Sequence, residues 1–285
     1  MADTIIVVPC YNEARRLDID AFVQHATTGP EHRFLFVNDG SSDDTLDILY
    51  DLQSGDPDRF SVLDLLSNGG KAEAVRQGVL AALERRPRFI GYWDADLATP
   101  LDAIEPFRQR LLERNDIEFV FGARIRMLGR AIDRHAHRHY LGRVFATVAS
   151  MTLGMGVYDT QCGAKLFRAS DETAALFQRP FITGWIFDVE LIARLMRQRR
   201  QSGGPPAEQV IFEQPLERWG DVAGSKVRPR DFFKAIYELV TIYRTYLRGA
   251  KHESQSGVGQ AVLVQPEADA RVLKLRTFNS PVGTK

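Results

Sequence analysis

Cysteine is scarce in this sequence, and an overall charge of either sign is absent. Two cysteines occur in 285 residues, Cys10 and Cys162, too few for the disulfide framework of a small secreted protein. Their scarcity favours a reducing compartment, so we expect the protein in the cytoplasm. Lysine plus arginine number 37, and aspartate plus glutamate also number 37. No global positive field is therefore present to attract nucleic acid, and any anion-binding surface must be local.

Long apolar runs are missing as well. No window approaches the roughly 18 apolar residues that a membrane-spanning helix needs. The first residues, MADTIIVVP, lack the basic segment and the longer apolar stretch of a signal peptide. The hydrophobic share of 44% nevertheless suits a globular protein with a substantial core. We therefore predict a protein that is soluble or that lies, at most, on a membrane surface.

The first 123 residues alternate short apolar runs with longer amphipathic patterns. The apolar runs cover residues 4–9, 33–38, 59–66, 88–96 and 117–123. Helical spacing of apolar residues marks the segments between them, at 18–26, 42–52, 71–86 and 101–114. Apolar strands separated by amphipathic helices are typical of βαβ units. The sequence thus predicts an α/β fold with a mostly parallel central sheet flanked by helices.

The pattern changes after residue 123. Helices are predicted over 132–153 and 185–200, strand segments within 159–167 and 209–217, and a loop over 201–209. Residues 229–250 form a long amphipathic pattern with a broad apolar face. The polar tail, 251–285, is expected to add nothing to the core.

Polar residues stand where the first four apolar runs end. They are Tyr11-Asn12-Glu13, Asn38-Asp39-Gly40-Ser41, the segment from Ser67 to Lys71, and Asp94-Ala95-Asp96. Ligands of open α/β sheets bind at the carboxyl ends of the strands, so we expect these groups to converge on one rim. Asp94 and Asp96 suit a hard divalent cation that also takes phosphate oxygens. The pair could equally be ordinary turn or cap residues, and its spacing alone does not choose between the two interpretations.

Six segments taken together resemble family 2 of the nucleotide-sugar glycosyltransferases. They are PCYNE at 9–13, VNDGSSDDT at 37–45, NGGKAEAVRQG at 68–78, DADLATP at 94–100, DTQCGAKLF at 159–167 and WIFDVELI at 185–192. Within that family the chain looks most like the enzymes that make dolichyl- or polyprenyl-phosphate glucose and mannose. The resemblance implies a GT-A fold, which is a Rossmann-like α/β domain, over residues 1–228. Residues 1–123 would be its nucleotide-sugar half and 124–228 its acceptor half, followed by the helix 229–250 and the tail 251–285.

The resemblance also implies roles for individual residues. Donor-binding residues would be Pro9, Tyr11, Glu13, Asp39, Lys71, Asp94, Ala95 and Asp96. The metal, Mg or Mn, would be held by Asp94 and Asp96, and the catalytic residues would be Asp96 and Asp188. The chain departs from many relatives at Asn38, where they carry an aspartate, so the donor base stays open between UDP and GDP. It also has Ala98 where mannosyl-phosphate relatives often carry a glutamine, which puts a third protein ligand in doubt.

An arginine-rich stretch from Arg124 to Arg143 contains one acid, Asp133. A lipid phosphate is largely ionised at neutral pH, since its second pKa is about 6, so an acceptor of this kind needs cations to hold it rather than a base. The predicted acceptor contacts are Arg124, Arg134, Arg138 and Arg143, joined by similarity by Gln161, Lys165 and Trp185. The same stretch could instead be a solvated basic face.

We therefore expect a metal-dependent inverting glycosyltransferase that moves glucose or mannose from a UDP- or GDP-sugar to a polyprenyl phosphate. A hydroxyl or small phosphorylated acceptor is the alternative, and a hydroxyl would require a general base, for which Asp188 is the candidate. A nucleotidyltransferase would need a Gly-rich triphosphate loop, which the N-terminus lacks. The helix 229–250 could lie on a membrane surface, or pack on the domain or on a second copy in a homodimer.

Overall fold

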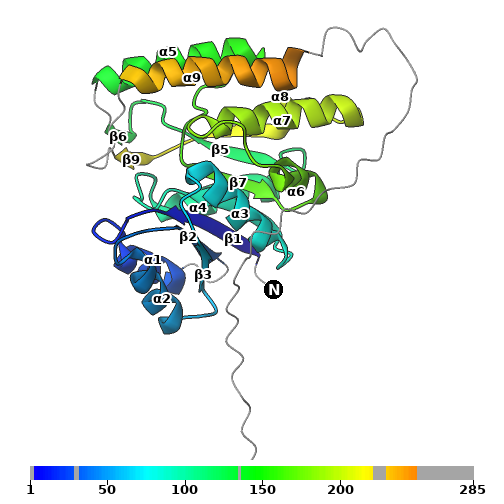
Figure 1. Cartoon of the computed structure of the whole chain (residues 1–285). Helices are drawn as coiled ribbons and strands as arrows, with labels where there is room; N and C mark the ends of the chain where they lie inside the picture. The colour runs from blue at the N-terminus through cyan, green and yellow to red at the C-terminus, as the bar shows by residue number, and fades with distance from the viewer. Residues whose placement is uncertain (1–2, 29–31, 134–135, 221–228, 249–285) are drawn as a thin grey trace, which may run out of the picture.

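The computed structural model describes residues 3–28, 32–133, 136–220 and 229–248, and a seven-stranded sheet forms its centre (Figure 1). The strands of this sheet are β1 (Thr4–Cys10), β2 (His32–Asp39), β3 (Phe60–Leu65), β4 (Phe89–Trp93), β5 (Phe119–Ala123), β7 (Ala164–Arg168) and β8 (Ile211–Pro215). Their spatial order is β3-β2-β1-β4-β7-β5-β8, and all run in one direction except β7, which is antiparallel to β4 and β5. A separate parallel pair joins β6 (Ala131–Asp133) to β9 (Arg218–Gly220).

Helices connect most of these strands. The α-helices are α1 (Ile19–Thr28), α2 (Thr45–Gly55), α3 (Lys71–Leu83), α4 (Ile104–Glu113), α5 (Ala136–Leu153), α6 (Asp171–Gln178), α7 (Phe187–Ser202), α8 (Ala207–Val210) and α9 (Pro229–Ile242). A 3-10 turn, η1 (Leu101–Ala103), precedes α4, and a π-helical turn, η2 (Tyr243–Leu247), continues α9.

Two hydrophobic cores lie on the two faces of the sheet. On one face, residues of β1 and β2 such as Val7 and Val37 pack with α3, α6 and α7. On the other face, Ile6, Phe34 and Phe36 pack with α1, α2 and α4. Because both faces are covered, the middle of β1 and of β2 is a continuous apolar run rather than an alternating pattern. This burial accounts for the continuous apolar runs in the sequence.

Helix α3 lies very close to the sheet because Gly78 has no side chain. A Cβ at Gly78 would stand 2.4 Å from Val7 Cγ1 and 2.7 Å from Val37 Cγ2. The glycine therefore allows the helix backbone to approach β1 and β2 directly. The approach places the first residue of α3, Lys71, beside the carboxyl ends of the strands.

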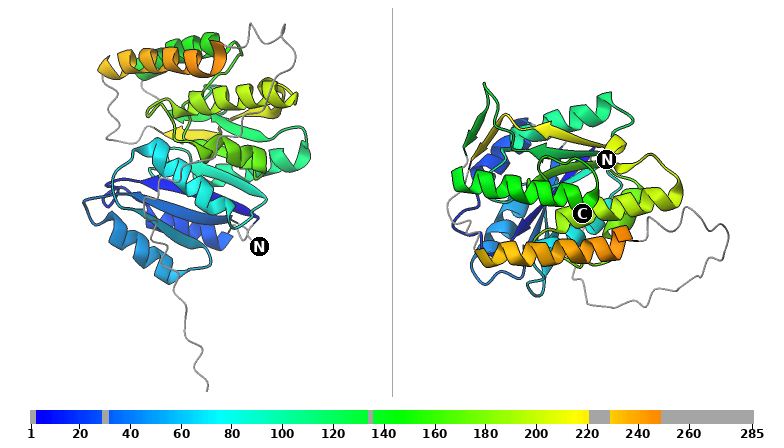
Figure 2. Two further views of the ribbon diagram at one scale, coloured as in Figure 1. Left: turned by 45° about the vertical axis from the view of Figure 1, so that its right-hand side comes forward. Right: turned by 90° about the horizontal axis from the view of Figure 1, so that it is seen from above.

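An outer layer covers α7. Helices α5 and α9 lie side by side above it, at the top of Figure 1, and the view from above in Figure 2 shows the same pairing. The Glu238 carboxylate of α9 accepts a hydrogen bond of 3.2 Å from the Ile186 N–H just before α7. Tyr246 Oη donates to Glu190 of α7 at 2.9 Å. Within the residues that the structure describes, no helix has both the length and the apolar composition to span a bilayer.

The structure confirms the mostly parallel α/β sheet and changes several local expectations. The helix predicted over 132–153 begins later, at Ala136, because residues 131–133 form β6 against β9. The segment predicted as a loop over 201–209 includes the end of α7 and the start of α8. Helix α6 was not predicted, although Ser170 caps it by accepting from Thr173 N. The predicted tail, 251–285, lies outside the described residues.

Candidate functional site

The loops that follow β1 and β2 are joined by hydrogen bonds at the carboxyl edge of the sheet. Asn12 N donates to Ser41 Oγ at 3.0 Å, and Ser42 N donates to Asn12 Oδ1 at 2.8 Å. Glu13 N donates to Thr45 Oγ1 at 2.8 Å. These bonds fix the loop that begins with Tyr11, which is 47% exposed. The exposed ring is free to stack on a planar ligand.

Asp39 links β2 to the glycine loop ahead of α3. Gly69 N donates to Asp39 Oδ1 at 2.7 Å and Gly70 N donates to Oδ2 at 2.9 Å. Burial raises the pKa of the Asp39 carboxyl, while the two N–H groups act in the opposite direction. Asp39 thus shapes the turn that presents Lys71.

Lys71 and Asp94 meet directly across the edge. Lys71 Nζ lies 2.5 Å from Asp94 Oδ1. Desolvation tends to lower the pKa of Lys71, but the charges of Asp94, Asp188 and Asp96 outweigh it and raise that pKa. Burial raises the pKa of Asp96, and the nearby Asp94 carboxylate raises it further. The convergence of the strand ends predicted from sequence is therefore present, with two carboxylates and one ammonium at its centre.

The donor set fits a divalent ion only in part. Asp94 and Asp96 supply carboxylate oxygens. Glu13 lies close enough for the negative charge of Asp96 to raise its pKa, although burial is the main cause of that rise. Glu13 Oε2 is buried and has no hydrogen-bond partner among the described residues. Among the residues that the structure describes, no three His, Cys, Asp or Glu side chains lie close enough together to hold a metal ion. An ion here would complete its shell with oxygens of a ligand or of water.

Gly163 provides the surface against which Asp94 lies. Asp94 N donates to Gly163 O at 3.0 Å. A Cβ at Gly163 would stand 1.9 Å from Asp94 Oδ2, so any larger residue there would require the carboxylate or the turn to shift. The turn before β7 and the carboxylate after β4 are thus fitted to each other.

A buried charge cluster lies beneath this turn. Lys165 is fully buried, and its Nζ lies 2.6 Å from Asp188 Oδ1. The same ammonium donates to Cys162 O at 2.7 Å and to Thr160 O at 3.1 Å. Tyr92 Oη donates to Asp188 Oδ1. The structure therefore places Lys165 inside the protein, where sequence reasoning expected an acceptor contact, and it pairs Asp188 with a buried cation.

Arg124 is also held by a carboxylate. Its Nε and Nη2 donate to the two carboxylate oxygens of Asp159 at 2.6 and 2.7 Å. The guanidinium carbon of Arg124 also lies over the Trp219 ring, 5.2 Å from the ring centre. The backbone N–H groups of Tyr158 and Asp159 donate in turn to Glu213. In this geometry Arg124 anchors the segment ahead of Gln161.

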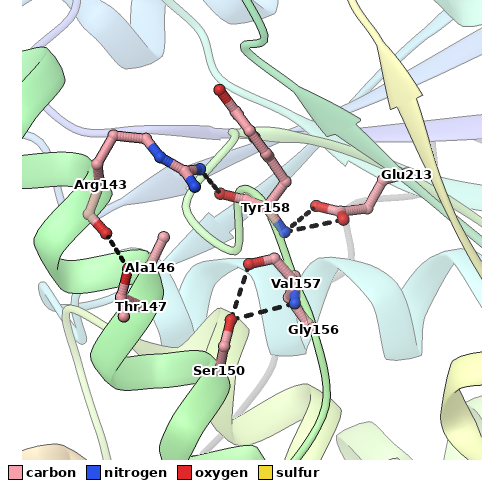
Figure 3. Close-up of a pocket in the computed structure, with 8 residues that line it drawn as sticks. All are labelled: Arg143, Ala146, Thr147, Ser150, Gly156, Val157, Tyr158 and Glu213. Atoms are coloured by element: carbon pink, nitrogen blue, oxygen red, sulfur yellow. Dashed lines mark hydrogen bonds between the residues drawn. The ribbon is translucent and has the colours of Figure 1, made fainter.

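Arg143 lines a pocket of about 390 Å³ between α5 and the turn at residues 156–158 (Figure 3). Its guanidinium stacks over the Tyr158 ring at 3.9 Å, and Nη1 donates to Tyr158 O at 3.2 Å. Ser150 closes the floor of the pocket by hydrogen bonds to Val157. The pocket combines a cation with an aromatic ring on an open face.

The remaining predicted residues are distributed around this centre. Pro9 is partly buried at the end of β1, and Ala95 is buried between the two aspartates. Gln161 is half-buried, and its Nε2 has no partner among the described residues. Trp185 is 38% exposed, with its ring 6.1 Å from that of Phe145 on α5. The side chains of Arg134 and Arg138 lie outside the described residues.

Sequence reasoning missed three residues of the site. They are Gly163, Asp159 and Tyr92, which hold Asp94, Arg124 and Asp188 respectively. The signal for Tyr92 was its position two residues before Asp94, on the same side of the strand. Gly163 and Asp159 lie in the segment DTQCGAK, where spacing alone gave no reason to single them out.

The chain matches a known family and several characterised relatives. The sequence profile described as glycosyl transferase family 2 matches residues 5–173. A dolichyl-phosphate beta-glucosyltransferase of Trichomonas vaginalis is 31% identical over 251 residues, which is 84% of this chain and 70% of that protein. The dolichyl-phosphate beta-glucosyltransferase of Drosophila melanogaster is 31% identical over 261 residues, covering 86% and 76%.

Solved structures share the fold. Glucosyl-3-phosphoglycerate synthase from Mycobacterium tuberculosis in complex with UDP superimposes with a TM-score of 0.58 at 18% identity, covering 85% of this chain and 80% of that one. The same enzyme with Mn²⁺, UDP-glucose and phosphoglyceric acid gives 0.59 at 17% identity, again covering 85% and 80%. With a profile match over more than half of its length, relatives at 31% identity and this shared architecture, the chain belongs to glycosyl transferase family 2 and is a glycosyltransferase of the GT-A fold.

Proposed function

We propose that the protein transfers glucose, with inversion, from UDP-glucose to a polyprenyl or dolichyl phosphate, in a reaction that depends on Mg²⁺ or Mn²⁺. The observation that carries the proposal is the grouping of Asp94, Asp96 and Lys71 at the carboxyl edge of the sheet. The relatives named dolichyl-phosphate beta-glucosyltransferases, matched over most of the chain, favour glucose over mannose and a lipid phosphate as acceptor.

The donor half needs positive charge where the diphosphate leaves. Asp94 and Asp96 would hold the divalent ion, which neutralises the departing diphosphate when bound. Lys71, already within reach of Asp94, would contact the same phosphates from the start of α3. Tyr11 would stack on the base, and Asp39 and Glu13 would contact the nucleoside from the loops after β2 and β1. The position of each loop follows from the hydrogen bonds that join them.

The acceptor half needs cations rather than a base. A phosphate oxygen of the acceptor would form a bond to the anomeric carbon while the bond from that carbon to the diphosphate breaks, and UDP leaves with the electron pair. Since the acceptor oxygen is already ionised, no proton has to be removed. Arg143 lines the open pocket of Figure 3, and we assign it the contact with the incoming phosphate.

The lipid would be reached at a membrane surface. The outer side chains of α9 and η2 include exposed apolar residues: Ile236, Tyr237, Val240 and Tyr243. The cations Lys234, Arg244 and Arg248 are exposed on the same segment, and of its two acids, Asp231 and Glu238, the second is buried. An apolar face bordered by cations suits the interface of an anionic bilayer. We therefore propose that α9 and η2 contact the membrane.

The function can be tested with purified protein and radiolabelled UDP-glucose or GDP-mannose. We expect label from UDP-glucose to enter an organic-extractable product when manganese and a short polyprenyl phosphate are present, and EDTA to abolish it. Asp94→Asn and Asp96→Asn should abolish transfer, whereas Asp102→Asn, an exposed aspartate on η1, should not.

Other acceptors provide the contrary outcomes. Label that appears only in phosphoglyceric acid, or only in a hydroxyl acceptor, would contradict the lipid phosphate. Release of pyrophosphate from a nucleoside triphosphate would contradict glycosyl transfer altogether.

A further inference from the structure

Lys165 is the only lysine among the described residues whose side chain is fully buried, and it makes no contact with solvent or with the open site. A buried ammonium is costly unless its three donors are satisfied. Here they meet three acceptors: the Asp188 carboxylate and the carbonyl groups of Thr160 and Cys162. Two of the three acceptors belong to one turn of the backbone, the turn that leads into β7.

The register of the sheet places this lysine directly below the metal-binding edge. Tyr92 of β4 pairs with Lys165 of β7, and Trp93 pairs with Ala164. Asp94 directly follows β4, and Gly163 directly precedes β7. Asp94 N donates a hydrogen bond of 3.0 Å to Gly163 O. Lys165 thus fixes the turn against which the Asp94 carboxylate lies.

We propose that Lys165 and Asp188 are positioning residues for Asp94. Lys165 holds the carbonyl groups of the turn, and Asp188, itself bonded by Tyr92, supplies the negative charge that makes the buried ammonium tolerable. The turn then places Gly163 where the Asp94 carboxylate fits against its bare Cα. On this basis Asp188 acts through Lys165 and takes no proton from the acceptor. The inference rests on the proposed function, because it assigns Asp94 to the metal and the diphosphate.

Removal of the ammonium has a defined consequence. In Lys165→Met, the carbonyl groups of Thr160 and Cys162 and the Asp188 carboxylate lose the ammonium that they bond. The turn is therefore expected to move, because buried carbonyl groups without a donor are costly. Asp94 would then lose its supporting surface while Asp96, on its own turn, keeps its bond from Ala98 N. Loss of a residue that supports a metal ligand typically weakens metal binding by roughly 10- to 100-fold.

The test measures Mn²⁺ binding rather than turnover. Free Mn²⁺ is quantified by electron paramagnetic resonance with the full chain, with and without UDP, for wild type, Lys165→Met and Lys165→Gln. We expect the dissociation constant to rise at least ~10-fold in Lys165→Met and less in Lys165→Gln, which retains donors for the carbonyl groups. Arg199→Met is the matched control, because it removes another buried cation at the far end of α7, paired with Glu118 and Glu172. Its dissociation constant should equal that of wild type.

Hydrogen exchange supplies a second readout that needs no metal. The Asp94 amide should lose protection in Lys165→Met while the amides of β1 and β2 keep theirs, which separates local displacement from general destabilisation. If Lys165→Met does not fold, Lys165→Gln carries both measurements. Unchanged Mn²⁺ affinity and unchanged Asp94 protection in a folded variant would overturn the inference. If wild type itself binds neither Mn²⁺ nor UDP, the proposed function fails as well, and the two failures are distinguishable.

Discussion

Asp94 occupies space that a side chain at position 163 would otherwise fill. The sterically required residue is glycine, because a Cβ would stand 1.9 Å from Asp94 Oδ2 and 2.2 Å from its Cγ. A methyl group there would force either the carboxylate or the turn to move. The role proposed for Asp94 therefore depends on the lack of a Cβ at position 163.

Gly163→Ala should weaken Mn²⁺ binding at least ~10-fold and lower stability by about 1–3 kcal/mol, because the added methyl displaces a carboxylate in a packed site. Mn²⁺ titration and urea unfolding provide the two measurements. Gly55→Ala is the control, since a Cβ at the end of α2 meets no atom within 4 Å. Wild-type Mn²⁺ affinity in Gly163→Ala would show that Asp94 does not bind the ion.

At this scale, sequence patterns predicted which polar groups meet at the carboxyl edge of the sheet and missed the residues that hold them in place. Asp94, Asp96 and Lys71 follow strands, and the rule that strand ends converge was sufficient to bring them together. The partners of Asp188 and Arg124 were not predictable, because Lys165 and Asp159 stand on the antiparallel strand and its preceding turn. Pairing across that strand depends on a register that spacing along the chain does not contain.

Two histidines connect α1 to β2 at the edge of the sheet opposite the site. His25 Nε2 and His32 Nδ1 are 2.9 Å apart with their rings stacked, and His32 Nε2 lies 3.6 Å from Glu105 of α4. Burial, reinforced by His25, lowers the pKa of His32 to about 4. Between about pH 4 and pH 6.5, His32 is therefore neutral in the folded state and protonated in the unfolded chain.

Stability should fall as the pH drops from 7 to 5. The unfolded state binds a proton at His32 near pH 6.5 while the folded state does not until about pH 4, so the loss is about 2 kcal/mol by pH 5. Urea unfolding at the two pH values measures it, and His32→Gln should remove most of the difference. An equal pH dependence in wild type and His32→Gln would refute the assignment.

Periodicity predicted most elements and misplaced those that depend on tertiary pairing. The β-rich runs of the first 123 residues became β1 to β5, because both faces of the sheet are covered and the apolar runs are continuous. The strands β6 and β9 were missed, since each is three residues long and exists only through pairing with the other. Helix α8 was missed for a similar reason, because its four residues are too few to show a helical period.

For the whole molecule, the outer layer formed by α5 and α9 determines which face could meet a bilayer (Figure 1). Tyr237 is 73% exposed and Met151 of α5 is 78% exposed, on the layer farthest from α1 and α2. This exposed apolar surface is the one that we propose contacts the bilayer. The expected binding is reversible and sensitive to salt.

Flotation with vesicles containing anionic lipid should recover wild type, and recovery should decrease as salt is raised. The double variant Tyr237→Ser and Val240→Ser should bind at least ~10-fold more weakly, because each large apolar side chain buried in the interface contributes about 1.5–3 kcal/mol. Val23→Ser, an exposed apolar residue of α1 on the opposite side, is the control. Equal flotation of the double variant and wild type would exclude α9 as the contact.

The reversed direction of β7 has a consequence for how such enzymes can diversify. Strand β5 ends and strand β7 begins at the same edge of the sheet, so residues 124–163 leave and return at one place. A connection that begins and ends at one edge can change in length or sequence without altering the order of the strands in the sheet. New acceptors could therefore evolve by replacement of residues 125–157, provided that the turn before β7, which supports Asp94, is kept.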